Sequence, residues 1–285
     1  MGKREKEGRR IKTLTPYNMI IPYIMVERND SQNSIATYVD VSGAETLIRK
    51  LRSEGYVSIG ILHVLLAAYV RAISQRPGVN RFIRGQKIYA RNGIVINIIV
   101  KRKMSIDAAD TSVKLRLKPT DTLIDIYNKW MELYTKVMEE DENGMDKTAR
   151  IICYIPGLIK KFTIALLKFL DYFGLLPGAI VDVSPFHGSM FITNMASLNI
   201  PPIVHHLYNF GNVPVFIAFG AKRYQIVAND DGTVTKNRVI DIIANLDERI
   251  CDGFYYASAM KLLKKYFQNP EELLKAPETV VEDIP

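Results

Sequence analysis

The sequence predicts an α+β fold, and three observations support this class. The segments Ser34 to Val41 and Thr111 to Lys118 alternate apolar and polar side chains, which is typical of half-buried strands. Ile59 to Gln75 and Thr120 to about Glu140 are long segments with apolar side chains at helical spacing, and both predict helices. Asn229-Asp230-Asp231-Gly232 predicts a hairpin turn late in the chain. Mixed helices and strands with late antiparallel hairpins indicate α+β rather than alternating α/β.

The other elements of the first half follow from local signals. Ala44 to Glu54 predicts a helix, which we expect Ser42 to cap with Glu45 three residues later in a capping box. Asn80 to Ala90 predicts a short strand pair around Arg84-Gly85. Gly93 to Lys103 is rich in β-branched residues and predicts a buried strand.

The last third is mostly β. The expected strands are Met190 to Asn194, Pro214 to Gly220, Ala221 to Ala228, Thr233 to Asp241 and Arg238 to Leu246. A helix is expected from Phe254 to Phe267, because Asp252-Gly253 precedes it and Asn269-Pro270 ends it.

These elements define one domain, residues 13–276, between two terminal segments. Residues 1–12 are basic and polar and predict a flexible arm. Residues 277–285 form an acidic tail that we expect to be loose.

One segment inside the domain, residues 155–177, is unusually apolar. It predicts a helix whose polar stripe is limited to Lys160, Lys161, Lys168 and Asp171. Such a helix either packs against the domain or a neighbouring subunit, or lies on a membrane surface with its lysines at the headgroups. Packing is favoured, because helices that are apolar nearly all round are usually buried.

Composition limits the functional classes. The formal net charge is +8 over 285 residues, but no zinc spacing, aromatic RNA-binding motif or helix-turn-helix accompanies it, so nucleic acid is not expected as a partner. A solvated basic surface, or a phosphate-bearing ligand such as coenzyme A, accounts for the charge. The sequence shows neither an apolar run of membrane-spanning length nor a signal core after the basic N-terminus, which favours the cytoplasm. Cys153 and Cys251 form no disulfide framework and have no metal spacing.

Three short stretches, in order along the chain, carry a family resemblance. Gln75-Arg76-Pro77-Gly78-Val79-Asn80 is similar to a segment that reads hPEVNA, and Phe191-Ile192-Thr193-Asn194 to one that reads TISN. Asp247-Glu248-Arg249-Ile250-Cys251-Asp252-Gly253 is similar to DHRVIDG and is the most specific of the three. The chain therefore resembles the catalytic domain of the dihydrolipoyl acyltransferases of 2-oxo acid dehydrogenase complexes, within the chloramphenicol acetyltransferase-like superfamily, from about Arg10 to about Leu274.

The resemblance implies a two-layer fold with a mixed sheet and packed helices, assembled as a homotrimer with the active site in a channel between subunits. Trimers of the family assemble further into cubic or icosahedral cores. It implies an acyltransferase whose co-substrate is a coenzyme A thioester, with small-molecule donor and acceptor and no metal. A neutral imidazole takes a proton from a thiol or hydroxyl acceptor, and a hydroxyl on the TISN strand donates to the oxyanion.

Carried onto this sequence, the resemblance places Thr193 at the oxyanion hydroxyl, Asp252 at a structural aspartate that is fixed through an arginine, and Gly253 at its glycine. Glu248 stands where the family has its catalytic histidine. A carboxylate with an ordinary pKa of about 4.3 is a weak base for a thiol, so catalysis by Glu248 needs burial that raises its pKa. The alternative, which we favour, is that Glu248 pairs with an arginine or lysine and does no chemistry.

Other imidazoles can replace the missing base. His205-His206 lies in the loop that follows the Thr193 strand, and the resemblance places this loop close to the channel. The less specific interpretation is that these two adjacent histidines form a surface or packing pair and take no part in catalysis. His187, which precedes the Thr193 strand, is a weaker candidate, and His63 is expected to be a core residue of an apolar helix.

Three hypotheses follow. The first is an acyltransferase with a site rearranged around Thr193, Glu248, Asp252 and His205 or His206, acting on a thiol, hydroxyl or amine acceptor. The second is a catalytically inactive relative that acts as a trimeric binding or scaffold protein. The third is an enzyme that acts at a membrane, through peripheral contact, or on a lipid-like acyl chain, through the helix of residues 155–177.

Overall fold

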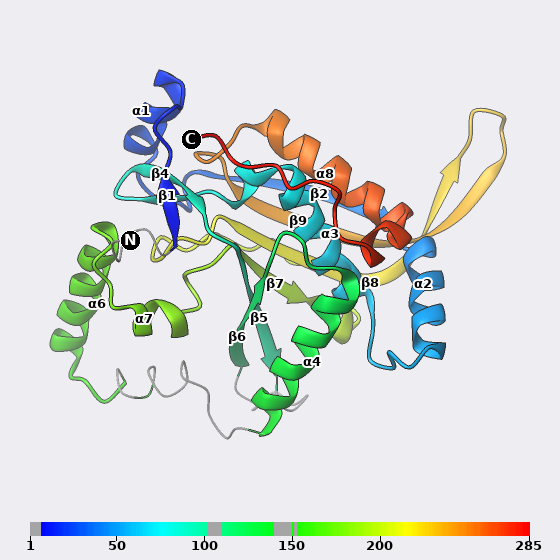
Figure 1. Cartoon of the computed structure of the whole chain (residues 1–285), viewed down its shortest axis with the longest axis horizontal. Coiled ribbons are helices and arrows are strands. Elements are labelled where there is room, and N and C mark those ends of the chain that lie inside the picture. The colour runs from blue at the N-terminus through cyan, green and yellow to red at the C-terminus, as the bar shows by residue number, and fades with distance from the viewer. Residues whose placement is uncertain (1–6, 102–109, 140–149, 151–152) are drawn as a thin grey trace.

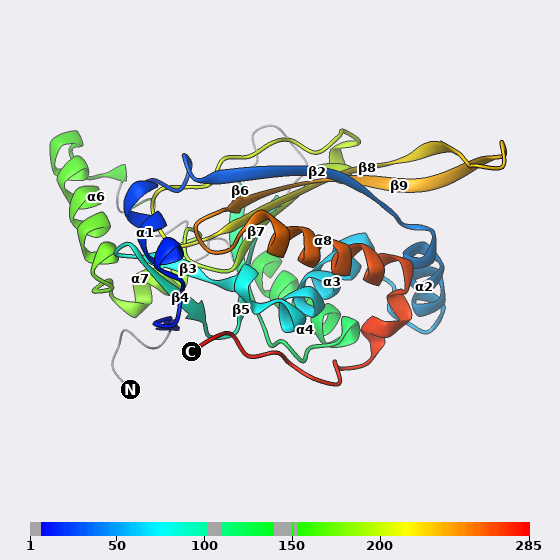
Figure 2. The same ribbon diagram turned by 90° about the horizontal axis from the view of Figure 1, so that it is seen from above.

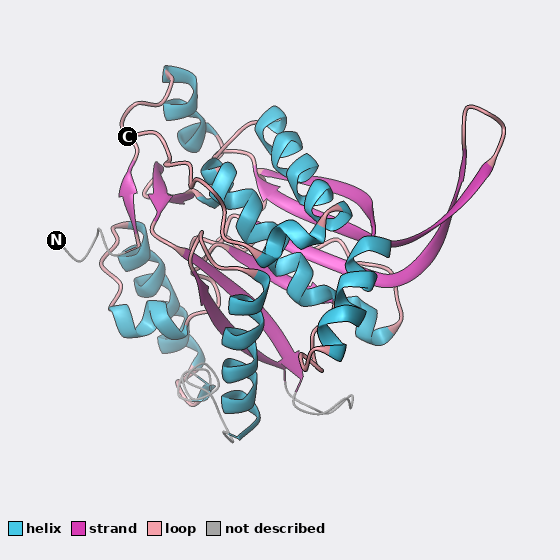
Figure 3. Cartoon of the chain, turned by 45° about the vertical axis from the view of Figure 1, so that its right-hand side comes forward, coloured by secondary structure: helices cyan, strands magenta, loops and turns pink. Residues whose placement is uncertain are grey.

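The computed structural model describes residues 7–101, 110–139, 150 and 153–285. Its centre is a six-stranded mixed sheet with the strand order β2-β9-β8-β7-β5-β6. The strands are β2 (Gln32–Asp40), β5 (Ile94–Lys101), β6 (Asp110–Leu117), β7 (Met190–Asn194), β8 (Val215–Ala228) and β9 (Val234–Asp247). Only β7 runs parallel to its neighbours, β5 and β8, and the other pairs of this sheet are antiparallel. The predicted α+β class is confirmed (Figures 1 and 3).

The second layer consists of helices on one face of the sheet (Figure 2). These helices are α2 (Ser42–Ser53), α3 (Ile61–Gln75), α4 (Leu123–Glu139) and α8 (Gly253–Gln268). The 3-10 helix η4 (Pro270–Leu274) follows α8. The predicted helices 44–54, 59–75, 120–140 and 254–267 agree with these elements within a few residues.

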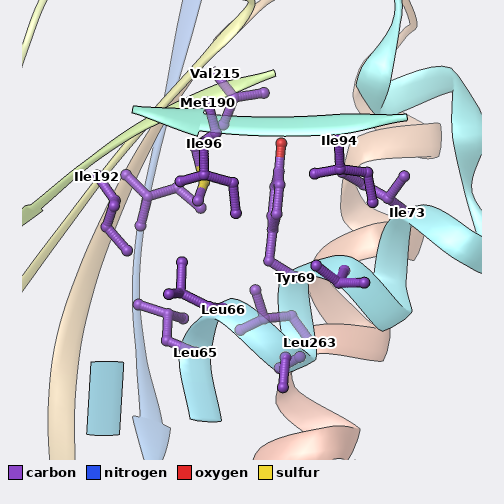
Figure 4. Close-up of a cluster of buried hydrophobic side chains, with 14 of the residues drawn as sticks. Leu65, Leu66, Tyr69, Ile73, Ile94, Ile96, Met190, Ile192, Val215 and Leu263 are labelled. Atoms are coloured by element: carbon purple, nitrogen blue, oxygen red, sulfur yellow. The ribbon is translucent and has the colours of Figure 1, made fainter. Parts of the chain in front are cut away.

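The core lies between α3 and the sheet. Leu65, Leu66 and Tyr69 of α3 face Ile96 of β5 and Met190 of β7 (Figure 4), and each is at most 4% exposed. The apolar sequence of α3 is thus explained, because this helix is covered by the sheet on one side and by α4 and α8 on the others.

A small second sheet, in the order β1-β4-β3, covers one end of the domain. It contains β1 (Gly8–Arg10), β3 (Phe82–Arg84) and β4 (Lys87–Arg91), with the 3-10 helix η2 (Pro77–Asn80) leading into it. Gly85 and Gln86 both have positive φ, which is the backbone geometry of a tight two-residue hairpin. The predicted strand pair around Arg84-Gly85 is confirmed.

Three sequence predictions are wrong in detail. The expected capping box at Ser42 is absent, because Val41 is the N-cap residue of α2 and the Glu45 carboxylate pairs with Lys222 at 2.6 Å. The strands expected at 214–220 and 221–228 are one strand, β8, and those at 233–241 and 238–246 are one strand, β9. The Asn229–Gly232 turn joins them as predicted and forms the tip of a hairpin that projects beyond the sheet (Figure 1).

The terminal segments differ from the expected flexible arm and loose tail over the residues that the structure describes. Gly8–Arg10 pairs with β4, so this part of the 1–12 arm is a strand, while residues 1–6 lie outside the described residues. The tail 277–285 is attached to the domain, because Asp283 forms an ion pair with Arg81 at 2.5 Å and the Val281 N–H donates to the Ser74 carbonyl. Specific polar contacts thus hold the acidic tail on the domain.

The apolar segment 155–177 forms helix α6 (Gly157–Tyr172), which is followed by the short helix α7 (Gly178–Val183). Neither helix has a buried residue, and Leu158 is 87% exposed. The packing of this helix into its own domain, one of the expected alternatives, is therefore wrong. A neighbouring subunit or a membrane surface remains as the partner of its apolar side. No helix in the described part of the chain is long and apolar enough to cross a bilayer.

Candidate active site

Two of the predicted site residues, Thr193 and His205, lie on the side of the sheet opposite the helices. Along β7, Met190 and Ile192 face the helical layer, so the side chains of Phe191 and Thr193 point to the other face. Phe191 stacks on Phe216 of β8, with ring centroids 5.3 Å apart. The loop of residues 199–214 crosses this face and adds Leu207 and Val213 to a small second apolar cluster. This loop brings His205 to the sheet.

His205 and Thr193 are in contact. The Thr193 Oγ1 lies 3.3 Å from the His205 Nε2, at the long end of the hydrogen-bond range. The imidazole stacks on the Phe216 ring, with centroids 4.1 Å apart and an interplanar angle of 10°. This stack fixes the plane of the ring, so the Nε2 atom is held towards the Thr193 hydroxyl.

The electrostatic setting keeps His205 neutral. Burial, and to a smaller degree the neighbouring His206, lower the pKa of His205 from its usual 6.5. A neutral imidazole has a free lone pair, which a general base requires. His206 makes no such contact with Thr193, and its ring lies edge-on to Tyr208. Of the two adjacent histidines, only His205 is therefore placed beside the candidate oxyanion hydroxyl.

Glu248 is far from Thr193 within one chain. Thr193 pairs with Ala218 on β8, and Ala218 pairs with Ile243 on β9. Glu248 follows Ile243 by five residues, which corresponds to roughly 16 Å along the strand direction. Its Oε2 accepts a hydrogen bond from the Asn33 side chain at 2.6 Å, not from an arginine or lysine. The structure thus brings Thr193 and His205 together and separates Glu248 from them.

Asp252 does not bind an arginine in the described structure. It is exposed, and its carboxylate accepts the Tyr255 N–H at 2.8 Å as the N-cap of α8. The aspartate of this stretch that pairs with arginines is Asp247, which is fully buried. Its two carboxylate oxygens accept from the Arg249 Nε and Nη2, both at 2.8 Å, and it lies 3.4 Å from the Arg28 Nε. Arg28 also donates to the Gly211 carbonyl in the loop that contains His205.

The other two histidines have structural partners. The His63 Nδ1 accepts the Gly60 N–H at 3.1 Å, and burial lowers the pKa of His63 to about 4. His187 is 1% exposed and lies between Ser184 at 2.9 Å and Asp171 at 3.1 Å. Ser184 lies three residues before His187 and Asp171 lies on α6, and the sequence pattern does not predict that either side chain contacts the imidazole.

Over the described part of the chain, no group of three or more histidine, cysteine, aspartate or glutamate side chains is arranged to hold a metal ion. The Thr193 and His205 pair offers the chemistry of a neutral imidazole beside a hydroxyl. Such a pair can move a proton and can stabilise a developing negative charge.

Comparison with known proteins adds the fold family. No model of a protein family matches the sequence, and no curated protein matches it either. Solved structures do match. A probable dihydrolipoamide acetyltransferase from Listeria monocytogenes superposes with a TM-score of 0.59 at 15% identity, covering 90% of this chain and 95% of that one. The dihydrolipoamide acetyltransferase of Azotobacter vinelandii gives 0.59 at 12% identity, covering 90% and 88%.

A chloramphenicol acetyltransferase matches with a TM-score of 0.53 at 14% identity, covering 88% of this chain and 94% of that one. The chain therefore has the fold of the chloramphenicol acetyltransferase-like acyltransferases. The resemblance expected from the three short stretches is confirmed at the level of fold, over nearly the whole length of these structures.

Proposed function

We propose that the protein is an acyltransferase that moves an acyl group from a coenzyme A thioester to a thiol, hydroxyl or amine acceptor. The observation that carries this proposal is the contact of 3.3 Å between Thr193 Oγ1 and His205 Nε2 in a chain with the acyltransferase fold. It supplies a hydroxyl and a neutral imidazole side by side, although the histidine of the family's motif is replaced by Glu248. Coenzyme A as the carrier follows from the fold family alone.

In the proposed reaction, the S–H, O–H or N–H group of the acceptor takes the place of Thr193 as the partner of His205 Nε2. The imidazole removes the acceptor's proton as the acceptor attacks the thioester carbonyl, and a tetrahedral oxyanion forms. The hydroxyl of Thr193, released from the histidine, donates to this oxyanion. The carbon–sulfur bond then breaks, and the coenzyme A thiolate takes the proton back from His205.

The test is release of free thiol from a panel of acyl-coenzyme A donors in the presence of thiol, alcohol and amine acceptors. We expect turnover that falls about 10²–10⁴-fold in His205→Ala, because a positioned general base contributes that much. Thr193→Val should lose about 10²–10³-fold in kcat, and Thr193→Ser should retain activity, because the hydroxyl remains. His206→Ala is the matched control and should resemble the wild type. Turnover that is unaffected in His205→Ala would contradict the assignment.

A second arrangement places the base on Glu248. Because Glu248 and Thr193 are distant within one chain, it requires a homotrimer in which Glu248 faces the Thr193 of a neighbouring subunit, as the resemblance implies. Loss of turnover in Glu248→Gln with full activity in His205→Ala would favour it. Glu248→Ala measured in parallel separates loss of the charge from loss of the hydrogen bond to Asn33.

The competing function is a catalytically inactive scaffold that keeps the trimer. The position of Glu248 favours it, since the residue at the motif's base position is held by an amide and lies far from Thr193 in the same chain. No thiol release and no binding of any acyl-coenzyme A by the folded trimer would support the scaffold. Any turnover that depends on His205 or Glu248 would exclude it.

The exposed apolar side of α6 is a candidate contact surface for assembly of the protein. We propose that a neighbouring subunit covers it, because Leu158, Ile159 and Phe162 are each more than half exposed. The alternative is a membrane surface, with Lys160 and Lys161 at the headgroups. Replacement of Leu158 and Phe162 by serine should lower the oligomeric state in sedimentation experiments. Loss of liposome binding with an unchanged oligomeric state would point to the membrane instead.

A further inference from the structure

A cavity of about 250 Å³ lies between the α6–α7 segment and the end of the domain formed by β4, β5 and β6. It is separate from the Thr193 and His205 pair. Gly188 lines the cavity and precedes Thr193 by five residues on the chain through β7, which corresponds to roughly 16 Å in an extended strand. The cavity and the candidate active site are therefore at opposite ends of the same strand.

Four cationic side chains from three strands line this cavity. They are Arg84 of β3, Arg91 of β4, and Lys114 and Arg116 of β6. Arg84 is only 9% exposed, and neither its Nε nor that of Arg91 has a hydrogen-bond partner in the described structure. Lys114 has three donor positions and one acceptor, the Val181 carbonyl at 2.6 Å. Buried donors without acceptors are costly, so they mark a place where an acceptor is missing.

Acidic side chains balance this charge only in part. Glu7 pairs with Arg84, Asp182 pairs with Arg116 at 2.6 Å, and Asp171 contacts His187 at 3.1 Å. The three arginines and three carboxylates balance when His187 is neutral, so the net charge of the lining is +1 with Lys114 protonated and zero with Lys114 neutral. The protonated lysine and its unused donor positions both favour a bound anion.

We propose that this cavity binds a compact oxyanion, such as inorganic phosphate or the phosphoryl or carboxylate group of a small molecule. The oxygen atoms of the anion accept from the Lys114 amine and from the guanidinium groups of Arg84 and Arg91, which line the cavity. Arginine donates in a planar fork that matches these anions, and a cavity of this size accommodates one such group. Val181, Asp182 and Asp171 of the α6–α7 segment each make a polar contact with the rest of the domain beside the cavity. The α6–α7 segment therefore forms the outer wall of the cavity.

The titration of Lys114 gives an independent readout. Burial and the nearby Arg116 and Arg91 lower the pKa of Lys114 to about 7, against the opposing effect of Asp182 and Glu7. Arg84, Asp171 and His187 also line the cavity. An anion beside the amine raises this pKa, so binding at pH 7 takes up about half a proton.

The experiment is isothermal titration calorimetry of the full chain with inorganic phosphate, phenyl phosphate and acetate at constant ionic strength, in two buffers of different ionisation enthalpy. We expect saturable binding with proton uptake in the wild type. Lys114→Met should weaken binding at least tenfold, and Lys114→Arg should bind without proton uptake. Lys161→Met, which alters an exposed lysine of α6 outside the cavity, should behave as wild type.

The three ligands distinguish the sources of the anion. Binding of inorganic phosphate alone identifies a site for the free ion, and tighter binding of phenyl phosphate identifies a site for a phosphoryl group on a larger molecule. Preference for acetate identifies a carboxylate site. No saturable binding of any of the three up to about 10 mM, or equal affinity of the wild type and a folded Lys114→Met variant, would overturn the proposal.

Discussion

Removal of the charge of Asp247 should destabilise the protein strongly. The carboxylate is fully buried, accepts from two nitrogens of Arg249 at 2.8 Å, and lies 3.4 Å from Arg28. Asp247→Asn keeps one oxygen acceptor, loses the second, and turns an NH₂ group towards a guanidinium. Breaking a buried pair by removing one partner costs about 3–5 kcal/mol, because the remaining charge is left uncompensated. Two buried cations depend on this one anion, so we expect a loss of that size.

The assay is urea unfolding followed by far-UV circular dichroism, at one protein concentration so that oligomerisation does not change between samples. Asp241→Asn is the matched control. Asp241 pairs with Arg223 at 2.7 Å, but the two side chains are 28% and 43% exposed, so its loss should cost about 0–1 kcal/mol.

Equal losses in the two variants would refute the reasoning. Equal losses would mean that backbone carbonyls, and not the Asp247 carboxylate, compensate the positive charges of the two buried arginines. Arg28 donates to the carbonyls of Tyr208 and Gly211, and Arg249 to those of Met25 and Val26.

Three further outcomes are expected in the same unfolding assay. His63 has a pKa of about 4 in the folded chain and 6.5 in the unfolded chain, so the unfolded chain binds more protons between these pH values. About 3 kcal/mol of stability is therefore present above pH 6.5 and is lost as the pH falls to 4. The variant His63→Gln should not show this loss. Gly211→Ala should be far more destabilising than Gly232→Ala, whose positive φ alone costs about 1–2 kcal/mol, because a Cβ at Gly211 would lie 1.9 Å from a carbonyl oxygen. In the dissociated monomer, Leu158→Ala should change the free energy of unfolding by less than about 0.5 kcal/mol, whereas Leu66→Ala in the core should cost about 2–5 kcal/mol. Equal effects in the monomer would contradict the exposed position of α6 within one chain.

Much of the fold could be predicted from the sequence, because local periodicity reflects burial. The apolar helix α3 and the strand β7 were predicted with nearly their observed bounds, since their side chains are fixed by the core that they form. The helix α1 (Pro16–Ile24) was not predicted, although Thr15 and Pro16 gave a signal for it: the Thr15 hydroxyl caps the Asn18 N–H. Its exposed apolar residues, such as Tyr17 and Ile24, hid the usual amphipathic pattern.

The predictions that failed depend on contacts between distant parts of the chain. The tail looked loose because its composition is acidic, yet Asp283 pairs with Arg81 some 202 positions away. Helix α6 was expected to pack against the domain or a neighbouring subunit, yet none of its residues is buried within its own chain. Side-chain composition predicts whether a segment can be buried, but the partner that buries it is set by the tertiary structure and by assembly.

The candidate site likewise contains one residue that the sequence indicates and one whose position depends on the tertiary structure. The resemblance places Thr193 at the oxyanion hydroxyl, and the structure puts this residue on β7, a strand that the sequence pattern also predicts. Whether His205 or His206 reaches that hydroxyl depends on the path of the 199–214 loop, which the sequence does not define. The structure selects His205, because only its ring stacks on Phe216 and faces the threonine. A base supplied by a loop can replace one supplied by the end of a neighbouring strand without any change in the sheet, which is how a fold can persist while the position of its catalytic imidazole changes.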